Sequence, residues 1–313
     1  MRGKLFCLPG RRKNKGNGEV SKMDISNAVI AVTGASSGIG KECARRLVQQ
    51  GARVYDLSRR CITGEKADGV TGVRCDVTGE QSVREAFEFI TEDAGRLDGL
   101  VCCAGSGLAG AVEETSDTEA EALMQVNYFG AVRCAREAMH IMRPAKQGTI
   151  VFISSVAALF GIPFQAFYSA GKYALEGTAE ALRNEARPFS VRVVCVLPGD
   201  TRTGFTAARR YTAQTGESTP YMAGFCSALN SMVKDELHGA PVEFAAKCVL
   251  RALKAKNPPP RIIVGAKYRM AAFAKRLLPD RAVSAALYAL YCRGEQKSEL
   301  WSFEKDVLKR KDT

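Results

Sequence analysis

The fold of this chain is decided by the stretch AVIAVTGASSGIG at residues 28–40. An apolar strand over residues 28–32 enters a glycine-rich turn, and a helix is expected from about Lys41 to Gln50. Strand, glycine turn and helix in that order form the arrangement that binds a dinucleotide, because the glycines let backbone N–H groups approach a pyrophosphate at the helix N-terminus. The spacing is G-x-x-x-G-x-G, and a glycine turn that only caps an ordinary helix is the alternative.

Strands and helix-length segments alternate along the rest of the chain. The expected strands cover residues 52–57, 72–77, 98–105, 149–155, 191–196 and 261–265, and the longest helices cover residues 80–93, about 117–142 and 168–186. Alternation with helix-length connections implies a parallel sheet covered on both faces. We therefore predict a Rossmann-type, doubly wound α/β fold with a seven-stranded parallel sheet and a C-terminal helical extension.

Composition limits the classes of protein. No apolar run approaches the roughly 18 residues that a membrane-spanning helix needs. Half of the net charge of +12 lies in residues 1–22, which we interpret as a disordered basic tail. The 11 cysteines form no C-x-x-C motif and there are only 2 histidines, which favours a reducing cytoplasm over disulfides or zinc. We expect a cytoplasmic protein whose nucleotide-binding domain covers residues 23–265, with a lid at about 200–240 and an extension over 266–313.

The end of the second strand bears on the choice of cofactor. An acid at this place would bind the ribose 2′-hydroxyl of NAD, whereas this chain has Ser58, Arg59 and Arg60. A hydroxyl followed by guanidinium groups suits the extra phosphate of NADP. Asp56 keeps NAD as an alternative cofactor, because on a regular strand it shares a face with Ser58 and could bind the ribose of NAD. NADP(H) is the favoured cofactor, and solvated surface arginines are the alternative interpretation.

Three further residues indicate acid–base chemistry. Tyr168 and Lys172 are four apart, so on a helix they share one face. A cation beside a phenol in a partly dry site lowers the phenol pKa from about 10 toward neutrality. Ser155 ends a β-branched apolar run and is expected at the carboxyl end of a buried strand, the edge where open α/β sheets bind ligands. An amphipathic helix with an interfacial Tyr and a solvated Lys is the alternative.

Taken together, these motifs resemble the short-chain dehydrogenase/reductase family. The matching residues stand in the family's order and spacing, and they are Gly34/Gly38/Gly40, Asp76, Ala104-Gly105, Asn127, Ser155, Tyr168-x-x-x-Lys172 and Pro198-Gly199. The resemblance covers about residues 26–205 and is weaker over 206–313. It implies association through the helices that bear Asn127 and Tyr168, as a homodimer or homotetramer.

The resemblance also implies a role for each matching residue. Tyr168 would be the acid/base, Lys172 would lower its pKa and hold the nicotinamide ribose, and Ser155 would hydrogen-bond the carbonyl oxygen. Asn127 would hold a water that relays protons, and Ser154 is the rival of Ser155. The residues expected at the cofactor are Gly34, Ser36, Ser37, Gly38, Ile39, Gly40, Ser58, Arg59, Asp76, Val77, Cys103, Ala104, Gly105, Tyr168, Lys172, Pro198, Gly199, Thr201 and Thr203.

One pair of residues departs from the family pattern. The family usually has Asn-Asn before Ala-Gly, and this chain has Cys102-Cys103. The second Asn normally steadies neighbouring strands by hydrogen bonding, so Cys103 should weaken that brace without removing activity. Inert buried thiols are favoured here over reactive ones.

The sequence therefore predicts an NADP(H)-dependent oxidoreductase that acts on a ketone or secondary alcohol. Apolar residues within 209–240 would favour a lipid-, steroid- or acyl-like substrate, and simple packing against the core explains them equally well. Two basic amphipathic helices, about 267–278 and 280–292, are expected to cover the pocket in preference to an anionic bilayer. A non-catalytic NADPH-binding scaffold is the alternative function. We expect no nucleic-acid partner, although the basic tail leaves nucleic-acid or membrane binding as a third hypothesis.

Overall fold

The computed structural model of the chain describes residues 22–216 and 219–293. The predicted basic tail therefore lies outside the described residues, except for Lys22, and so does the end of the C-terminal extension. Within the described part of the chain, no helix is both long enough and apolar enough to cross a bilayer.

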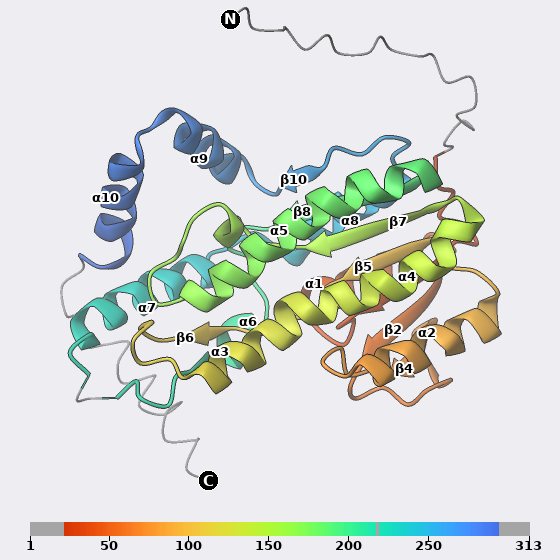
Figure 1. The fold of residues 1–313 in the computed structure, drawn as a ribbon, viewed down its shortest axis with the longest axis horizontal. Helices are drawn as coiled ribbons and strands as arrows, with labels where there is room; N and C mark the ends of the chain where they lie inside the picture. Colours follow the sequence, from red (N-terminus) through yellow and green to blue (C-terminus); the bar gives the residue numbers. More distant parts are fainter. Residues whose placement is uncertain (1–21, 217–218, 294–313) are drawn as a thin grey trace, which may run out of the picture.

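One sheet of eight strands forms the centre of the molecule, in the order β10-β8-β7-β5-β1-β2-β4-β3 (Figure 1). The strands are β1 (Val29–Thr33), β2 (Arg53–Ser58), β3 (Lys66–Ala67), β4 (Val70–Arg74), β5 (Gly99–Cys102), β7 (Gly148–Ile153), β8 (Val191–Leu197) and β10 (Arg261–Ile263). All pairs are parallel except β3 with β4. The seven predicted strands and the doubly wound parallel architecture are thus confirmed. The sequence missed β3, a two-residue exposed edge strand without an apolar run.

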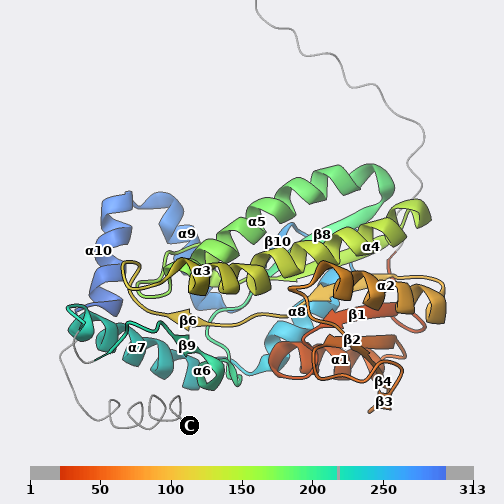
Figure 2. The same ribbon diagram turned by 60° about the horizontal axis from the view of Figure 1, so that its bottom comes forward.

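Helices cover both faces of this sheet (Figures 1 and 2). They are α1 (Gly38–Val48), α2 (Glu80–Ala94), α4 (Ala131–Ala145), α5 (Ala166–Ala186) and α8 (Val242–Lys254). The apolar sides of α2, α4 and α5 form one core with the sheet, and those of α1 and α8 form a second core on the other face. Every residue of β1 and β7 is buried, as expected for strands covered on both sides.

The strand order places the ligand-binding edge at the carboxyl ends of β1 and β5. The chain adds β2 and β4 on one side of β1 and then crosses to β5 on the other. At such a switch point the loops after the two strands diverge and leave a crevice, which is where open α/β sheets bind ligands. The glycine turn after β1 and the small residues after β5 both lie there.

The helix expected over residues 117–142 is interrupted. It consists of α3 (Asp117–Met124), a π-helical segment (Gln125–Gly130) that contains Asn127, and α4. Short π-helical segments are often found at functional sites. A π-helical turn holds one residue more than an α-helical turn, which leaves the spacing of the apolar residues nearly unchanged. The sequence therefore predicts one continuous α-helix in place of these three segments. The first helix also differs from expectation, because α1 begins at Gly38, inside the glycine turn, and not near Lys41.

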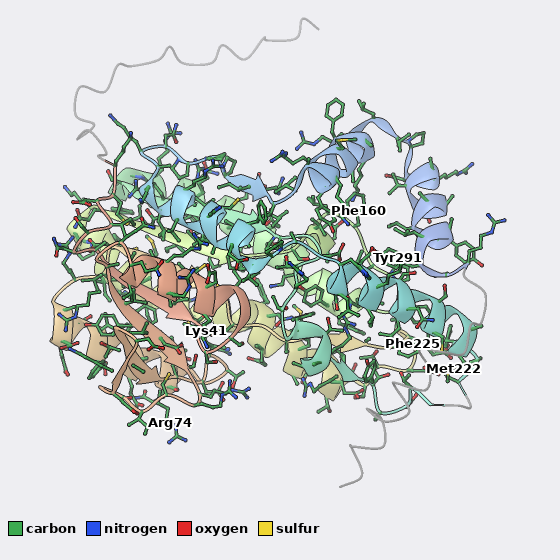
Figure 3. The ribbon with its side chains drawn as sticks, turned by 180° about the vertical axis from the view of Figure 1, so that it is seen from behind. Lys41, Arg74, Phe160, Met222, Phe225 and Tyr291 are labelled. Atoms are coloured by element: carbon green, nitrogen blue, oxygen red, sulfur yellow. The ribbon has the colours of Figure 1, made fainter. Side chains whose placement is uncertain are left out.

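The region between β8 and α8 forms a separate layer at the carboxyl edge of the sheet (Figure 2). It contains α6 (Phe205–Ala208), β9 (Arg210–Tyr211) and α7 (Met222–Leu237), and β9 pairs with β6 (Leu108–Ala109). The buried residues of α7 pack on Ala109 and Tyr211 in a third apolar cluster that includes Phe225, labelled in Figure 3. These apolar residues thus pack into a cluster of their own and not against the main cores, which the sequence offered as the alternative to a substrate-facing surface.

The last two described helices, α9 (Ala266–Leu277) and α10 (Asp280–Tyr291), stand out from the sheet beside α7 (Figures 1 and 3). In α10 the Leu290 carbonyl oxygen accepts a hydrogen bond of 3.2 Å from Ser231 of α7. Neither helix has a buried residue. Their exposed apolar side chains are Met270, Phe273, Leu277, Leu278, Tyr288 and Leu290. α10 therefore touches α7 from outside, whereas α9 contacts the loop after β8 through Tyr268 and hydrogen-bonds the Leu159 carbonyl oxygen through Lys275. The exposed apolar side chains of both helices do not form part of the cores.

Replacing Gly40 with Ala should destabilise the fold by about 1–3 kcal/mol, because the added methyl would lie 2.4 Å from the carbonyl oxygen of Gly34. Gly177→Ala in α5 is the matched control. No described atom lies within 4 Å of its added methyl, and alanine should stabilise an exposed helix position by about 0.5–1 kcal/mol. Urea unfolding measures both changes, and an unaltered stability of Gly40→Ala would show that the turn accommodates a side chain.

Candidate active site

The turn between β1 and α1 is a backbone cradle that needs its glycines. Gly34 and Gly38 have φ angles of +67° and +52°, in the left-handed region that other residues avoid. Position 40 has no room for a side chain, since a Cβ there would collide with the Gly34 carbonyl oxygen. The turn and the start of α1 are thus shaped by three residues with no side chains.

This cradle fits the diphosphate of a dinucleotide. Ser37, directly before α1, makes no side-chain capping hydrogen bond, and the first turn of α1 has no acidic residue. The first N–H groups of the helix and the positive end of its dipole are therefore left for an anion. Ser36 is exposed beside the turn, whereas Ile39 packs against the core beneath it.

Asp56 braces the cradle from below. Its carboxylate Oδ1 accepts a hydrogen bond of 3.0 Å from the Ala35 N–H and another from the Ser58 hydroxyl. The side chain is only 8% exposed. An acid that is buried and already engaged in this way is poorly placed to bind a ribose hydroxyl, which weakens the case for NAD that the sequence left open.

Two exposed arginines flank the cradle after β2. Arg60 reaches the hydroxyl of Ser36 at 3.4 Å, and Arg59 lies close enough to Asp76 to help lower the pKa of that carboxyl. Arg60 belongs to the run that the sequence indicates for the phosphate, but it is absent from the residues expected at the cofactor, which include Ser58 and Arg59. The signal was nevertheless present, in the second guanidinium of the Ser-Arg-Arg run.

Asp76 and Val77 follow β4 in the loop. Burial alone would raise the pKa of Asp76, but hydrogen bonds to its Oδ1 from the N–H (2.9 Å) and hydroxyl (2.8 Å) of Thr78 overcome that effect and lower it. Val77 is buried and packs against Gly130, because a Cβ added to Gly130 would lie 2.7 Å from the Val77 side chain. Both residues, which the sequence places at the cofactor, thus lie in one loop, and Val77 packs against the π-helical segment.

The residues that follow β5 are hydrogen-bonded to Thr33, the last residue of β1. The hydroxyl oxygen of Thr33 accepts hydrogen bonds from the N–H groups of Cys103 and Ala104, each 3.0 Å long. A Cβ on Gly34 would lie 3.1 Å from the Cα of Ala104, so the two loops touch. The brace expected to weaken at Cys103 is therefore supplied by Thr33. The thiol of Cys103 instead faces Cys43 of α1, and this contact and burial raise the pKa of Cys43.

Asn127 ties the interrupted helix to the same loop. Its Oδ1 accepts from the N–H of Ser106, and its Nδ2 donates to the carbonyl oxygen of Ser106, both at 2.8 Å. The side chain is 1% exposed, and Gly105 lies against it. The π-helical turn thus aims the amide at the segment that follows Ala104.

Ser155, Tyr168 and Lys172 meet at the carboxyl end of β7. Lys172 donates a 2.9 Å hydrogen bond to the carbonyl oxygen of Ile153, the last residue of that strand, and its ammonium lies 5.7 Å from the centroid of the Tyr168 ring. Tyr168 is half-buried, and the neighbouring hydroxyl of Ser155 lies close enough to lower its pKa. Ser154 is buried behind them, and its hydroxyl finds no partner among the described residues. The serine that faces the phenol is therefore Ser155.

The pKa values differ from the sequence expectation. Burial raises the pKa of Tyr168 to about 12, against a smaller lowering by its hydrogen bond with Ser155. Burial lowers the pKa of Lys172 to about 8. The predicted depression of the Tyr168 pKa by Lys172 is not found, because the ammonium points to the Ile153 carbonyl and loss of solvent outweighs the attraction. Tyr168 is thus a neutral phenol at neutral pH.

The loop after β8 lies between the cradle and α9. A Cβ on Gly199 would overlap the ring of Tyr268, and the Tyr268 hydroxyl accepts a 2.9 Å hydrogen bond from the Asp200 N–H. The Thr201 hydroxyl donates back to the Gly199 carbonyl at 2.9 Å. Thr203 lies 3.6 Å from the Cβ position of Gly38. Pro198 begins this loop, and its carbonyl oxygen accepts a hydrogen bond from the N–H of Val156.

Phe205 closes the site over the phenol. Its ring centroid lies 5.6 Å from that of Tyr168, and a Cβ on Gly107 would lie 3.0 Å from its edge. The sequence did not single out Phe205 or Tyr268, because each reaches the site through contacts between distant segments. The structure therefore brings the predicted site residues to one edge of the sheet and adds two aromatic side chains there.

Comparison with known proteins agrees with this arrangement. A family profile described as short chain dehydrogenase matches residues 28–214. The chain belongs to the short-chain dehydrogenase family. As a short-chain dehydrogenase it is an oxidoreductase of a family that uses NAD or NADP, and the resemblance inferred from its motifs is confirmed.

Two reductases are among the relatives of this short-chain dehydrogenase. It is 39% identical over 264 residues to a 3-ketodihydrosphingosine reductase of Bacteroides thetaiotaomicron, covering 84% of this chain and 97% of that protein. It is 33% identical over 226 residues to a 3-ketodihydrosphingosine reductase of Bos taurus, covering 68% of this chain and 66% of that protein.

Solved structures show the same fold. A short-chain dehydrogenase from Streptomyces avermitilis matches with a TM-score of 0.72 and 29% identity, over 85% of this chain and 97% of the other. A short chain dehydrogenase from Burkholderia cenocepacia in complex with NADP matches with a TM-score of 0.65 and 28% identity, over 85% and 98%.

Replacing Lys172 with Met should remove a pH-dependent part of the stability. Burial lowers the Lys172 pKa from 10.5 to about 8, so between these pH values the unfolded chain binds more protons than the folded one. The free energy of unfolding of the original protein should therefore rise by about 2–3 kcal/mol across that interval on account of this group. Urea unfolding of both proteins at pH 7.5, 9 and 10 measures the effect as the difference between the two pH profiles. Parallel pH profiles would contradict it.

Proposed function

We propose that this short-chain dehydrogenase is an NADPH-dependent reductase of a ketone on a hydrophobic, lipid-like substrate. The observation that carries the proposal is the meeting of Ser155, Tyr168 and Lys172 beside a glycine cradle that fits a dinucleotide. A long-chain 3-keto lipid of the 3-ketodihydrosphingosine type is the first substrate to try, because a reductase of that name aligns over 97% of its length.

Each site residue has a separate role in a carbonyl reduction. NADPH, when bound, supplies the hydride. Ser155 donates a hydrogen bond to the carbonyl oxygen, and Tyr168 gives that oxygen a proton as negative charge develops on it. Because burial keeps the Tyr168 pKa at about 12, the phenol carries its proton at neutral pH. Lys172, held by Ile153, provides the positive charge next to the phenol.

The residues around the cradle favour NADPH over NADH. Arg60 contacts Ser36 at the cradle, and Arg59 lies on the adenine side near Asp76. Both guanidinium groups are exposed and can take a phosphate by bidentate hydrogen bonding. Asp56, the acid that would compete for the ribose of NADH, is engaged with the Ala35 N–H and with Ser58.

We also propose that the protein is cytoplasmic and assembles through α4 and α5. A groove between these helices is lined by apolar side chains that include Met139, Leu182 and Phe189, and Phe129 and Tyr173 are exposed nearby. A second copy would cover this apolar surface, and the outcome would be a homodimer or homotetramer. Light scattering of the purified full-length chain tests this, and a monomeric mass would refute it.

Tyr168→Phe should lower kcat by at least about 10²-fold, because it removes only the proton that the developing alkoxide needs. The dissociation constant for NADPH, measured by fluorescence, should stay within about twofold. Tyr173→Phe is the control, since this exposed tyrosine is on the same helix and outside the site. Undiminished turnover in Tyr168→Phe would refute its role, and NADPH binding by the original chain without reduction of any carbonyl would favour the non-catalytic scaffold.

Arg60→Ala and Arg59→Ala should each reduce the preference for NADPH over NADH. The loss of a charge-assisted hydrogen bond to phosphate predicts a change of about 10-fold or more in the ratio of dissociation constants. Arg84→Ala on α2, whose ion pair is with Glu80 of the same helix, is the matched control. If the ratio is unaltered in both variants, the selectivity lies elsewhere.

A further inference from the structure

The lid carries a buried ion pair that the proposed reaction does not use. The side chain of Arg209 is 0% exposed and pairs through Nη2 with the carboxylate of Glu236, which is 15% exposed. Glu236 also accepts a hydrogen bond from the hydroxyl of Thr206. The pair joins the segment before β9 to the last turn of α7.

Half of the guanidinium is left without acceptors. Neither Nε nor Nη1 of Arg209 has a hydrogen-bond partner among the described residues, although both atoms are buried. A buried N–H of a charged group that makes no hydrogen bond is costly, and native proteins satisfy such groups with a ligand or water. The structure thus leaves donors in the lid for an oxygen from outside the chain.

These donors lie near the active site. The Arg209 guanidinium lies 5.9 Å from the centroid of the Phe205 ring, whose other neighbour is the ring of Tyr168. A Cβ on Gly107 would touch both Phe205 and the Cγ of Arg209, so the pair lies over the loop that Asn127 holds. Arg209 lowers the pKa of Tyr168 and Glu236 raises it, which places both charges within electrostatic reach of the phenol.

We infer that Nε and Nη1 of Arg209 bind a second oxygen of the substrate, a hydroxyl or carbonyl oxygen a few bonds from the ketone that is reduced. Glu236 already balances the guanidinium charge, so a neutral oxygen leaves the buried site neutral, whereas a carboxylate would leave it with an uncompensated negative charge. The pair therefore selects a polar but uncharged oxygen next to the ketone. This inference takes the reaction from the proposed function. The binding of the second oxygen to Arg209 does not depend on that reaction.

A matched pair of ketones tests the inference. With the full-length chain and NADPH, 1-hydroxydecan-3-one should have a KM about 10- to 100-fold lower than decan-3-one, the range expected for hydrogen bonds from a charged donor. In Arg209→Met this ratio should fall to near one, mostly through a higher KM for the hydroxyketone. The carboxylate 3-oxodecanoate should bind no better than decan-3-one. A ratio that Arg209→Met does not change, or tighter binding of the carboxylate, would overturn the inference.

Two further variants guard against a merely structural effect. Arg210→Met removes the exposed arginine next in the chain and should preserve the ratio between the two ketones. Arg209→Lys keeps a charge beside Glu236 and so protects the fold, but a single ammonium cannot serve the carboxylate and the substrate with the same planar geometry. It should lose most of the preference. If Arg209→Lys keeps the full ratio, or if Arg210→Met loses it, the assignment to the Arg209 guanidinium is wrong.

A binding measurement separates this inference from the proposed reaction. Calorimetric titration of the full-length chain with decane-1,3-diol and decan-3-ol needs no turnover. Tighter binding of the diol that disappears in Arg209→Met would support the second-oxygen site even if neither ketone were reduced. Equal binding of the two alcohols would overturn the site even if both ketones were reduced.

Discussion

The hydrogen bond from the buried ammonium of Lys172 to the carbonyl oxygen of Ile153 is the interaction on which the site depends. It joins α5 to the end of β7. Ser155 follows that strand end by two residues and Tyr168 precedes Lys172 by one helical turn, so the bond sets hydroxyl against phenol. A buried ammonium without such an acceptor would be too costly to keep. The glycine cradle reaches the same edge because only β5 separates β7 from β1 in the sheet.

The features that the sequence predicted well are those that local spacing determines. Apolar runs specify the seven parallel strands, glycines at fixed intervals specify the turn before α1, and a helical repeat puts Tyr168 above Lys172. The sequence could not reveal the π-helical turn at Asn127, because one added residue hardly alters the apolar period. Nor could it decide how Asp56 is used, since strand alternation gives the side of the sheet and not the hydrogen-bond partner.

The remainder of the site depends on contacts between distant segments. Tyr268 bonds to Asp200 across 68 positions, and Arg209 meets Glu236 across 27. No periodicity in either segment encodes such a meeting. The pKa of Tyr168 was mispredicted for a related reason, because burial by the lid and the loops is a tertiary property that outweighs the charge of a helical neighbour. Charged residues of the lid segment thus contribute to the electrostatics of the phenol.

The lid pair and the proposed acid act on one another. Glu236 raises the pKa of Tyr168 and Arg209 lowers it, so the phenol responds to whatever the guanidinium binds. A neutral oxygen at Arg209 adds no charge to these opposing effects. An anion would add to the effect of Glu236, raise the pKa of the phenol further and make proton donation to an alkoxide harder. The same two residues would therefore reject an anionic head group twice, once at binding and once at proton transfer.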